Sequence, residues 1–198
     1  MLNRTSILIA ASCISLVNSQ WIENADAAMD SFRIQSFKNP RLCFDVANNR
    51  VTNGTPIQVA DCKQIGHSAQ SWIKGNRIPN YECADAEGGC LYEIKLKSNP
   101  KFCLDYRYSK RPPEDNVNLQ IWQCRDSRNG NAAYWGFALA PNGQALSLFS
   151  GVPGVGIFTK LSPSISTDAR EGQTIRMRDF KSPNIMKNHY QYWVTDYF

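Results

Sequence analysis

Residues 32–45 read Phe-Arg-Ile-Gln-Ser-Phe-Lys-Asn-Pro-Arg-Leu-Cys-Phe-Asp, and residues 92–105 read Tyr-Glu-Ile-Lys-Leu-Lys-Ser-Asn-Pro-Lys-Phe-Cys-Leu-Asp. A constant offset of 60 residues brings Cys43 onto Cys103 and Asp45 onto Asp105. The following segments also correspond, because Pro-Ile-Gln-Val-Ala-Asp-Cys at 56–62 matches Asn-Leu-Gln-Ile-Trp-Gln-Cys at 118–124. Self-similarity at a fixed spacing is typical of a repeat architecture.

A third copy of the pattern is present in eroded form. Residues 172–180 align with residues 54–62, although Phe180 stands in the cysteine position. The segment before it, near residues 146–159, has neither the cysteine nor the aspartate. Each copy ends near a tryptophan, at Trp72, Trp135 and Trp193. We therefore expect one domain over residues 31–198, built from units at about 31–75, 90–138 and 144–198.

The units have the period of β-strands. Leu42, Phe44 and Val46 alternate with Cys43 and Asp45, and the later segments of units one and two alternate in the same way. Asn53-Gly54 is a tight hairpin signal, and the two Asn-Pro pairs mark turns. The segments 75–89, 109–116, 126–131 and 162–172 are predicted to be surface loops. No long segment has a helical period, so the predicted fold class is all-β.

The cysteine pattern predicts disulfides. The first nineteen residues resemble a secretory signal peptide that would remove Cys13, and six cysteines remain. Within units one and two, each cysteine lies opposite the apolar face of its strand, so pairing within units is favoured. A different connectivity, or free thiols in a reducing compartment, is the alternative. The predicted pairs are Cys43–Cys62, Cys103–Cys124 and, in the insertion between units, Cys83–Cys90.

The amino-terminal segment predicts export. Arg4 provides a positive charge, and the apolar stretch 7–17 is too short to span a bilayer as a helix. Cleavage after Ser19 would leave residues 20–30 as an extension before the domain; a cut near Ala27, or a lipid anchor at Cys13, is an alternative. We expect a secreted, extracellular protein without a transmembrane segment.

The composition points away from catalysis and from nucleic acid. The net charge is +5 without a dense basic run. The two histidines, His67 and His189, fall in different units. There is no metal-ligand spacing, phosphate-binding glycine loop or Gly-x-Ser-x-Gly motif, although a pair of carboxylates suited to glycosidase chemistry stays open. We expect no enzyme activity, no cofactor and no metal.

Several short motifs resemble those of the ricin-B lectins. Cys-Phe-Asp-Val at 43–46 and Cys-Leu-Asp-Tyr at 103–106 are similar to that family's Cys-Leu-Asp-Val element, and 120–124 is similar to its Gln-Leu-Trp-x-Cys strand. Gln-Ser-Trp72 and Gln-Tyr-Trp193 are similar to its Gln-x-Trp signature. The resemblance covers residues 31–198. It implies a β-trefoil of twelve strands, with a six-stranded barrel, capping hairpins and a shallow sugar site in each unit.

Unit two has the residues that a sugar requires. Three polar or aromatic residues are separated from the cysteine of their strand by an even number of residues: Asp105 from Cys103, and Gln120 and Trp122 from Cys124. Because strand side chains alternate between two faces, this spacing predicts that they lie with the cysteines on an outer, solvent-facing surface. The carboxylate and amide suit sugar hydroxyls, and the indole suits the apolar face of the ring. Tyr108 and Asn131 lie in predicted loops, and we expect these loops to close over the site. The alternative is structural, with Asp105 bonding turn amides and Trp122 a covered core edge.

The other units are less complete. Unit one has Asp45, Gln58 and Gln70 but Ala60 in place of the tryptophan, with His67 as a weaker candidate for stacking. Unit three has Arg176 and Arg178 where the other units have glutamine and an aromatic residue or alanine, so no ordinary sugar site is expected there. A sulfate or a sialate is one ligand that such a basic strand suits, and a solvated strand face without a ligand is the alternative. The three closing tryptophans are predicted to be core residues.

The predicted function is therefore secreted carbohydrate binding. Glycans or glycoproteins on a cell surface or in the extracellular matrix would be the partners. A protein-binding trefoil is the alternative, either a protease inhibitor or the binding subunit of a toxin with partner toxin subunits, because one fold serves many functions.

Overall fold

A computed structural model of the chain consists of strands with almost no helix in the part that it describes. The described residues are 31–77, 91–106, 116–124, 134–139, 146–151, 161–165, 168–179 and 192–197. The chain divides into residues 1–30 and 31–198, and every described residue belongs to the second unit. A 3-10 helix, η1 (Ala47–Asn49), accompanies twelve strands there. The strands are β1 (Phe32–Ser36), β2 (Leu42–Val46), β3 (Thr55–Asp61), β4 (Trp72–Arg77), β5 (Tyr92–Leu96), β6 (Phe102–Tyr106), β7 (Val117–Gln123), β8 (Tyr134–Leu139), β9 (Leu146–Gly151), β10 (Leu161–Ser164), β11 (Arg176–Asp179) and β12 (Tyr192–Tyr197).

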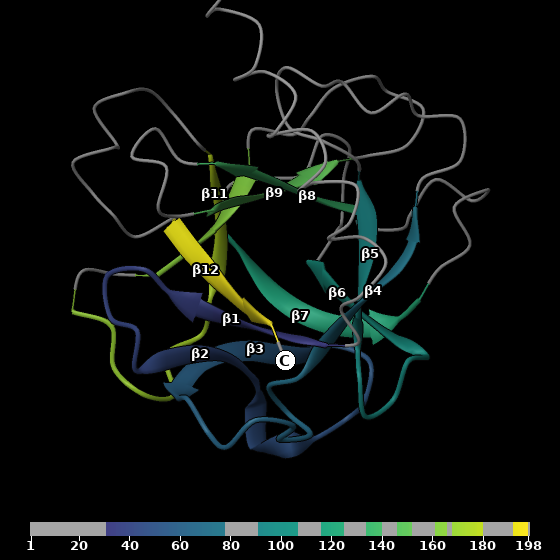
Figure 1. Cartoon of the computed structure of the whole chain (residues 1–198), viewed down its shortest axis with the longest axis horizontal. Coiled ribbons are helices and arrows are strands. Elements are labelled where there is room, and N and C mark those ends of the chain that lie inside the picture. Colours follow the sequence, from purple (N-terminus) through teal and green to yellow (C-terminus); the bar gives the residue numbers. More distant parts are fainter. Residues whose placement is uncertain are drawn as a thin grey trace, which may run out of the picture. The chain divides into compact units, whose positions relative to one another are not determined.

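Six of these strands close into a barrel. Going round the ring, β1 pairs with β4, β4 with β5, β5 with β8, β8 with β9, β9 with β12, and β12 with β1 (Figure 1). Every neighbouring pair is antiparallel. A closed ring leaves none of these six strands at a free sheet edge. The six-stranded barrel implied by the sequence is confirmed.

The other six strands form three hairpins, β2–β3, β6–β7 and β10–β11. The hairpins also pair with one another. β3 pairs with β7, β7 pairs with β11, and a bridge between Gln58 and Thr174 connects β3 to the segment just before β11. The chain thus repeats a four-strand unit three times, with the first and fourth strands in the barrel and the middle two in a hairpin. This is a β-trefoil, as predicted.

One backbone contact repeats around the pseudo-threefold. In each unit, a residue with positive φ precedes the third strand and donates its N–H to a carbonyl of another unit's third strand. The positive φ favours glycine or asparagine. The three contacts are Gly54 to Ile121, Asn116 to Met177, and Gly172 to Val59, with N···O distances of 3.0, 2.8 and 2.8 Å.

Three details of the predicted secondary structure need correction. Strand β10 lies largely within the predicted surface loop 162–172, and β4 runs to Arg77 inside the predicted loop 75–89. Asn53-Gly54 does not form a two-residue hairpin, because residues 47–54, including η1, connect β2 to β3. The sequence of β10, Leu-Ser-Pro-Ser, lacks the usual strand residues and contains proline, so its pairing with β11 is a tertiary effect.

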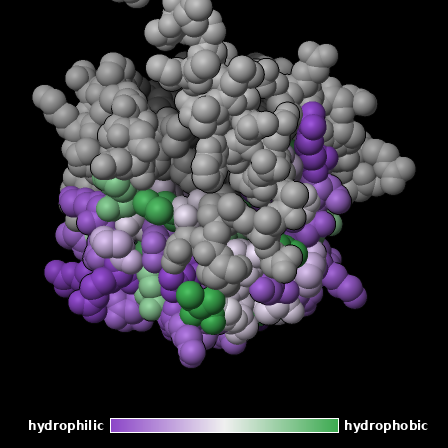
Figure 2. All heavy atoms as spheres, in the orientation of Figure 1, coloured by the Kyte–Doolittle hydropathy of each residue, from purple (hydrophilic) through white to green (hydrophobic). Residues whose placement is uncertain are grey.

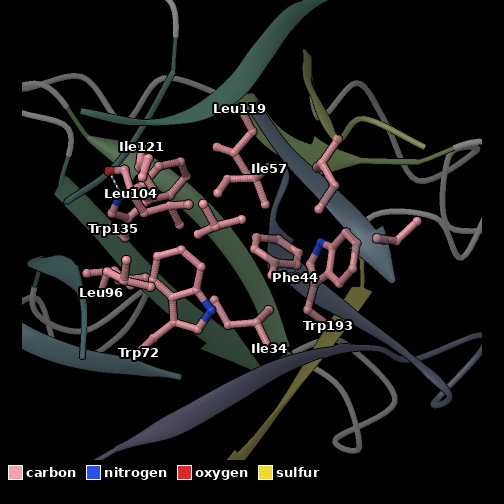
Figure 3. Packing of buried hydrophobic residues seen from close by; sticks show 14 of the residues in the cluster. Ile34, Phe44, Ile57, Trp72, Leu96, Leu104, Leu119, Ile121, Trp135 and Trp193 are labelled. Carbon is pink, nitrogen blue, oxygen red and sulfur yellow. Dashed lines mark hydrogen bonds between the residues drawn. The ribbon is translucent and has the colours of Figure 1, made fainter. Parts of the chain in front are cut away.

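The three closing tryptophans lie in the core. Trp72 and Trp135 have no exposed surface, and Trp193 is 1% exposed, so this prediction is confirmed. Figure 3 shows them around aliphatic side chains such as Ile34 and Leu104. Phe44 meets Trp193 edge to face with ring centroids 4.5 Å apart. Aromatic rings in this arrangement add to the stabilisation from burial.

Two predicted disulfides are confirmed. Cys43 is bonded to Cys62 and Cys103 to Cys124, with sequence separations of 19 and 21 residues. The predicted Cys83–Cys90 pair lies outside the described residues. Each confirmed bond joins the first strand of a hairpin to the residue directly after the second strand, near the open end of the hairpin.

Removing the Cys103–Cys124 bond should lower the free energy of unfolding by about 3 kcal/mol, because the unfolded chain gains the entropy of an open loop. The Cys103→Ser/Cys124→Ser variant tests this by urea denaturation, with the wild-type chain in its oxidised form as the reference. An unchanged unfolding midpoint would contradict this expectation. The Cys43–Cys62 bond, which the variant retains, should keep the unit-one hairpin closed.

Candidate functional site

The unit-two site consists of Asp105, Gln120 and Trp122. Asp105 on β6 lies directly opposite Gln120 on β7, and Cys103 lies directly opposite Trp122. Residues opposite each other in an antiparallel pair point to the same face of the sheet. The structure therefore brings the three predicted side chains onto one face, together with the disulfide.

The three side chains differ in their access to solvent. Asp105 and Gln120 are 5% and 6% exposed, whereas Trp122 is half-buried. The expected open, solvent-facing surface therefore holds only for the tryptophan. The carboxylate and the amide form the buried part of the site, and the indole is the part that solvent reaches.

Unit one contributes a boundary to the unit-two site. A Cβ atom added at Gly54 would lie 3.6 Å from Cζ3 of Trp122, so the turn before β3 passes close to the indole. The backbone N–H of Gln123 donates to Oδ1 of Asn53 over 2.8 Å, and the N–H of Gly54 donates to the carbonyl of Ile121. Trp122 is thus held beside a fixed turn of a different unit. Sequence reasoning recognised the turn but not its contact with Trp122.

In unit one, hydrogen bonds within the protein occupy the equivalent carboxylate. Asp45 lies opposite Gln58 and is buried. Its Oδ1 accepts a hydrogen bond from Nε2 of Gln58 at 3.1 Å, and its Oδ2 accepts one from Nε2 of Gln70 at 2.9 Å. Nζ of Lys63 lies 3.7 Å from the same Oδ2. Two amides and an ammonium group thus hold the Asp45 carboxylate in place within the protein.

Lys63 was missed by sequence reasoning, since an exposed lysine after a strand has no distinguishing signal. Gln70 was recognised, but its contacts are internal: its Oε1 also accepts from the N–H of Lys63 at 2.8 Å. His67 serves the turn, because its Nδ1 accepts from the N–H of Ala69. Tyr108 and Asn131 lie outside the described residues.

In unit three, arginines occupy the corresponding positions. Arg176 and Arg178 on β11 lie opposite Ser164 and Ser162 on β10. The alignment is fixed by the tryptophans, since Nε1 of Trp193 donates to the carbonyl of Pro163 as Nε1 of Trp135 donates to that of Leu104. Ser164 therefore matches Asp105, and Arg178 matches Trp122. The predicted correspondence of the two arginines with Gln120 and Trp122 is thus found in the strand register.

The described residues contain no group of three His, Cys, Asp or Glu side chains suited to holding a metal ion. In the same ranges, none of the helical structure is long and apolar enough to cross a membrane. Figure 2 shows that the described surface on this side is mainly hydrophilic, with small separate hydrophobic areas.

Comparison with known proteins identifies the fold and no family. No protein-family model matches the chain, and no curated protein matches its sequence significantly. Among solved structures, a designed 3-fold symmetric protein, ThreeFoil, matches with a TM-score of 0.58 and 12% identity, over 83% of this chain and 96% of that chain.

Two other solved structures match the same fold. A mosquitocidal holotoxin matches with a TM-score of 0.55 and 13% identity over 87% of this chain, which corresponds to 18% of the holotoxin chain. The solution structure of the mdaA-1 domain matches with a TM-score of 0.53 and 17% identity, over 85% and 90% of the two chains. At such identities the likeness concerns the fold alone, and together with the strand pairing it shows that this chain is a β-trefoil.

Proposed function

We propose that this protein is a secreted carbohydrate-binding protein of the ricin-B lectin type, which binds a glycan through the unit-two site. The observation that carries the proposal is the position of Asp105 directly opposite Gln120 on a trefoil hairpin, with Trp122 on the same face. These are also the residues in which the sequence resembles that family.

The three side chains supply complementary interactions for a sugar. A carboxylate accepts hydrogen bonds from hydroxyl groups, and charged acceptors form stronger bonds than neutral ones. The amide of Gln120 both donates and accepts. The half-exposed indole of Trp122 offers a flat apolar surface to the C–H face of a pyranose ring. In this proposal the ring stacks on Trp122, and its hydroxyls reach down to the more deeply buried Asp105 and Gln120.

Unit two is favoured over unit one because of two differences. The residue that matches Trp122 in unit one is Ala60, which offers no surface for stacking. The residue that matches Gln70 in unit two is Ala133, which has no amide to donate to Asp105 as Gln70 donates to Asp45. The unit-one carboxylate accepts two hydrogen bonds from amides of its own unit, whereas unit two has no amide at the position of Gln70.

Export and the absence of catalysis belong to the same proposal. Two disulfides are formed within the described part of the chain, and structural disulfides persist in oxidising compartments. A binding module outside the cell needs neither a cofactor nor a catalytic centre. A single shallow site of this kind binds weakly, so avidity would come from a multivalent ligand or from assembly.

The second candidate is the binding subunit of a toxin, with partner toxin subunits. It is favoured by the match to 18% of a mosquitocidal holotoxin chain, in which a region of this fold is part of a larger molecule. Under this candidate, the chain would also bind a catalytic partner. Pull-down of proteins from the source organism's culture fluid with the immobilised chain would separate the two candidates.

Replacing Trp122 with alanine should weaken glycan binding at least tenfold, because the stacking surface is removed. Asp105→Ala should have a comparable effect through the lost charged acceptor. The measurement is a glycan array with the oxidised protein, followed by titration calorimetry on the best glycan. Trp122→Phe is the matched control, because it retains an aromatic plate and should keep most of the affinity.

The variants must be compared as folded proteins, so their thermal unfolding midpoints should be recorded alongside binding. Equal binding by wild type, Trp122→Ala and Asp105→Ala would exclude the unit-two site. A folded wild-type chain that binds no glycan would remove the lectin proposal and leave the protein-binding alternative.

A further inference from the structure

Unit three carries a different chemistry at the positions that form the proposed sugar site in unit two. We propose that its β10–β11 hairpin is a second site, which binds the anionic group of an acidic saccharide, a sulfate ester or a carboxylate. This inference rests on the proposed function for the class of ligand, but it concerns other residues and another interaction.

The hairpin presents two cations side by side. Arg176 and Arg178 are both exposed. They are two residues apart on one strand, so they point to the same face about 6.5–7 Å apart along the strand. No carboxylate of the described residues forms an ion pair with either guanidinium. An external anion therefore does not have to displace such a partner.

One guanidinium is held in place by another unit. Nη1 of Arg176 donates to Oδ1 of Asn116 at 3.2 Å. Asn116 is the positive-φ residue of the turn before β7, and its N–H donates to the carbonyl of Met177, between the two arginines. The Asn116 turn therefore lies beside Arg176, as the Gly54 turn lies beside Trp122. The other N–H groups of the Arg176 guanidinium stay available to a ligand, and a guanidinium can bind an oxyanion through two parallel bonds.

Two hydroxyl groups lie opposite the arginines. Ser162 and Ser164 are 1% and 8% exposed and lie opposite Arg178 and Arg176 in the β10–β11 pair. Oγ of Ser162 is buried and has no hydrogen-bond partner among the described residues. An unsatisfied buried hydroxyl carries a free-energy cost. An oxygen atom of a ligand bound by the arginines would accept a hydrogen bond from the Ser162 hydroxyl. The strand opposite the two cations thus adds hydroxyl donors to the proposed site.

The position in the fold favours a saccharide over an acidic protein surface. The arginines take the places of Gln120 and Trp122 in the pseudo-threefold, where the proposed sugar of unit two makes its contacts. Arginine in place of tryptophan removes the stacking plate and adds charge. The change is thus from a neutral sugar ring to an anionic substituent as the recognised group.

The test is the affinity of the full oxidised chain for heparin-derived octasaccharide, measured by surface plasmon resonance at low and moderate salt. Chemically desulfated octasaccharide, sialyllactose and lactose are the comparison probes. The Arg176→Gln/Arg178→Gln variant removes both cations. Arg50→Gln/Lys101→Gln is the matched control, because it removes two exposed positive charges from other units.

We expect the Arg176→Gln/Arg178→Gln variant to bind the sulfated probe at least tenfold more weakly, whereas the control variant stays within about twofold of wild type. Sialyllactose binding that depends on the same arginines, with no binding of lactose at these residues, would assign a carboxylate as ligand; binding of the sulfated probe alone would assign a sulfate. Equal losses in both double variants, or equal binding of sulfated and desulfated probes, would overturn the proposal.

The test of the unit-three hairpin can fail or succeed independently of the test of the unit-two site. Trp122→Ala and Asp105→Ala should leave the arginine-dependent binding of the sulfated probe within about twofold of wild type. If neutral glycans fail to bind while this binding persists, the unit-two proposal fails and the unit-three proposal stands. If neutral glycans bind through Trp122 while both double variants bind the sulfated probe like wild type, the unit-two proposal stands and the unit-three proposal fails.

Discussion

Replacing Trp135 with alanine should lower the free energy of unfolding by about 3–5 kcal/mol, which is the usual cost of truncating a large buried aromatic side chain. Trp135 has no exposed surface and meets Tyr106 edge to face with ring centroids 6.0 Å apart. Its Nε1 also donates to the carbonyl of Leu104 at 3.0 Å, as Figure 3 shows. The substitution therefore removes packing and leaves a buried carbonyl without this donor. Urea denaturation followed by tryptophan fluorescence and circular dichroism would measure the loss.

A matched pair of milder variants isolates the hydrogen bond. Trp72 is equally buried, but its Nε1 has no hydrogen-bond partner among the described residues. Phenylalanine at either position removes an indole N–H and a similar volume. Trp135→Phe should therefore cost about 1 kcal/mol more than Trp72→Phe. Equal losses for the two variants would show that the bond to Leu104 contributes nothing measurable.

Replacing Glu93 with alanine should be the second large effect, at about 3–5 kcal/mol. Glu93 is buried on β5, and its Oε2 lies 3.0 Å from Nζ of the largely buried Lys95 and accepts from the N–H of Asn76 at 3.1 Å. Alanine would leave a largely buried ammonium and a backbone N–H without their acceptor. This cost is the penalty for unpaired groups rather than the net contribution of the ion pair.

The local geometry explains why the side chains of Glu93 and Lys95 are held against strand β4. The β4–β5 register shifts between Lys74 and Arg77, and Glu93 satisfies an N–H within that irregularity. A Cβ atom added at Gly75 would lie 2.5 Å from Cε of Lys95, so the lysine stem covers the glycine. Glu93→Gln keeps an acceptor for Asn76 and removes the charge, so its loss should be smaller than that of Glu93→Ala. Chemical denaturation of both variants measures this, and a larger loss for glutamine would contradict the assignment of the N–H bond.

The proposed functions assign different tasks to equivalent positions. In unit one, the hairpin face is an internal hydrogen-bond network around Asp45. In unit two, the same face carries Trp122 and a carboxylate, and in unit three it carries two exposed arginines and two serines. The pseudo-threefold thus provides three copies of one platform, and substitution at two or three positions of each copy changes what that platform can contact.

Much of the unit-two arrangement followed from the sequence. Strand side chains alternate between the two faces of a sheet. Asp105 is two residues from Cys103 and Trp122 is two residues from Cys124, so the predicted bond between these cysteines placed both side chains on one face. The disulfide pairing followed from the same alternation and the repeat. The burial of Asp105 did not follow, because burial depends on segments that are distant in the chain. Local sequence patterns also could not predict the contact of Trp122 with the Gly54 turn. The same is true of the hydrogen bonds that Asp45 accepts.

The repeat, the strand alternation, two disulfides and the core position of the closing tryptophans could all be predicted from the amino-acid sequence, because each depends on residue types at short or repeated spacings. Three other features became visible in the folded chain alone: Leu161–Ser164 is a strand, Asn116 takes the place of Gly54 in another unit, and Ser162 lies opposite Arg178. Those features depend on pairing between units, where backbone N–H and C=O groups of remote segments satisfy one another even when the local residues favour a loop.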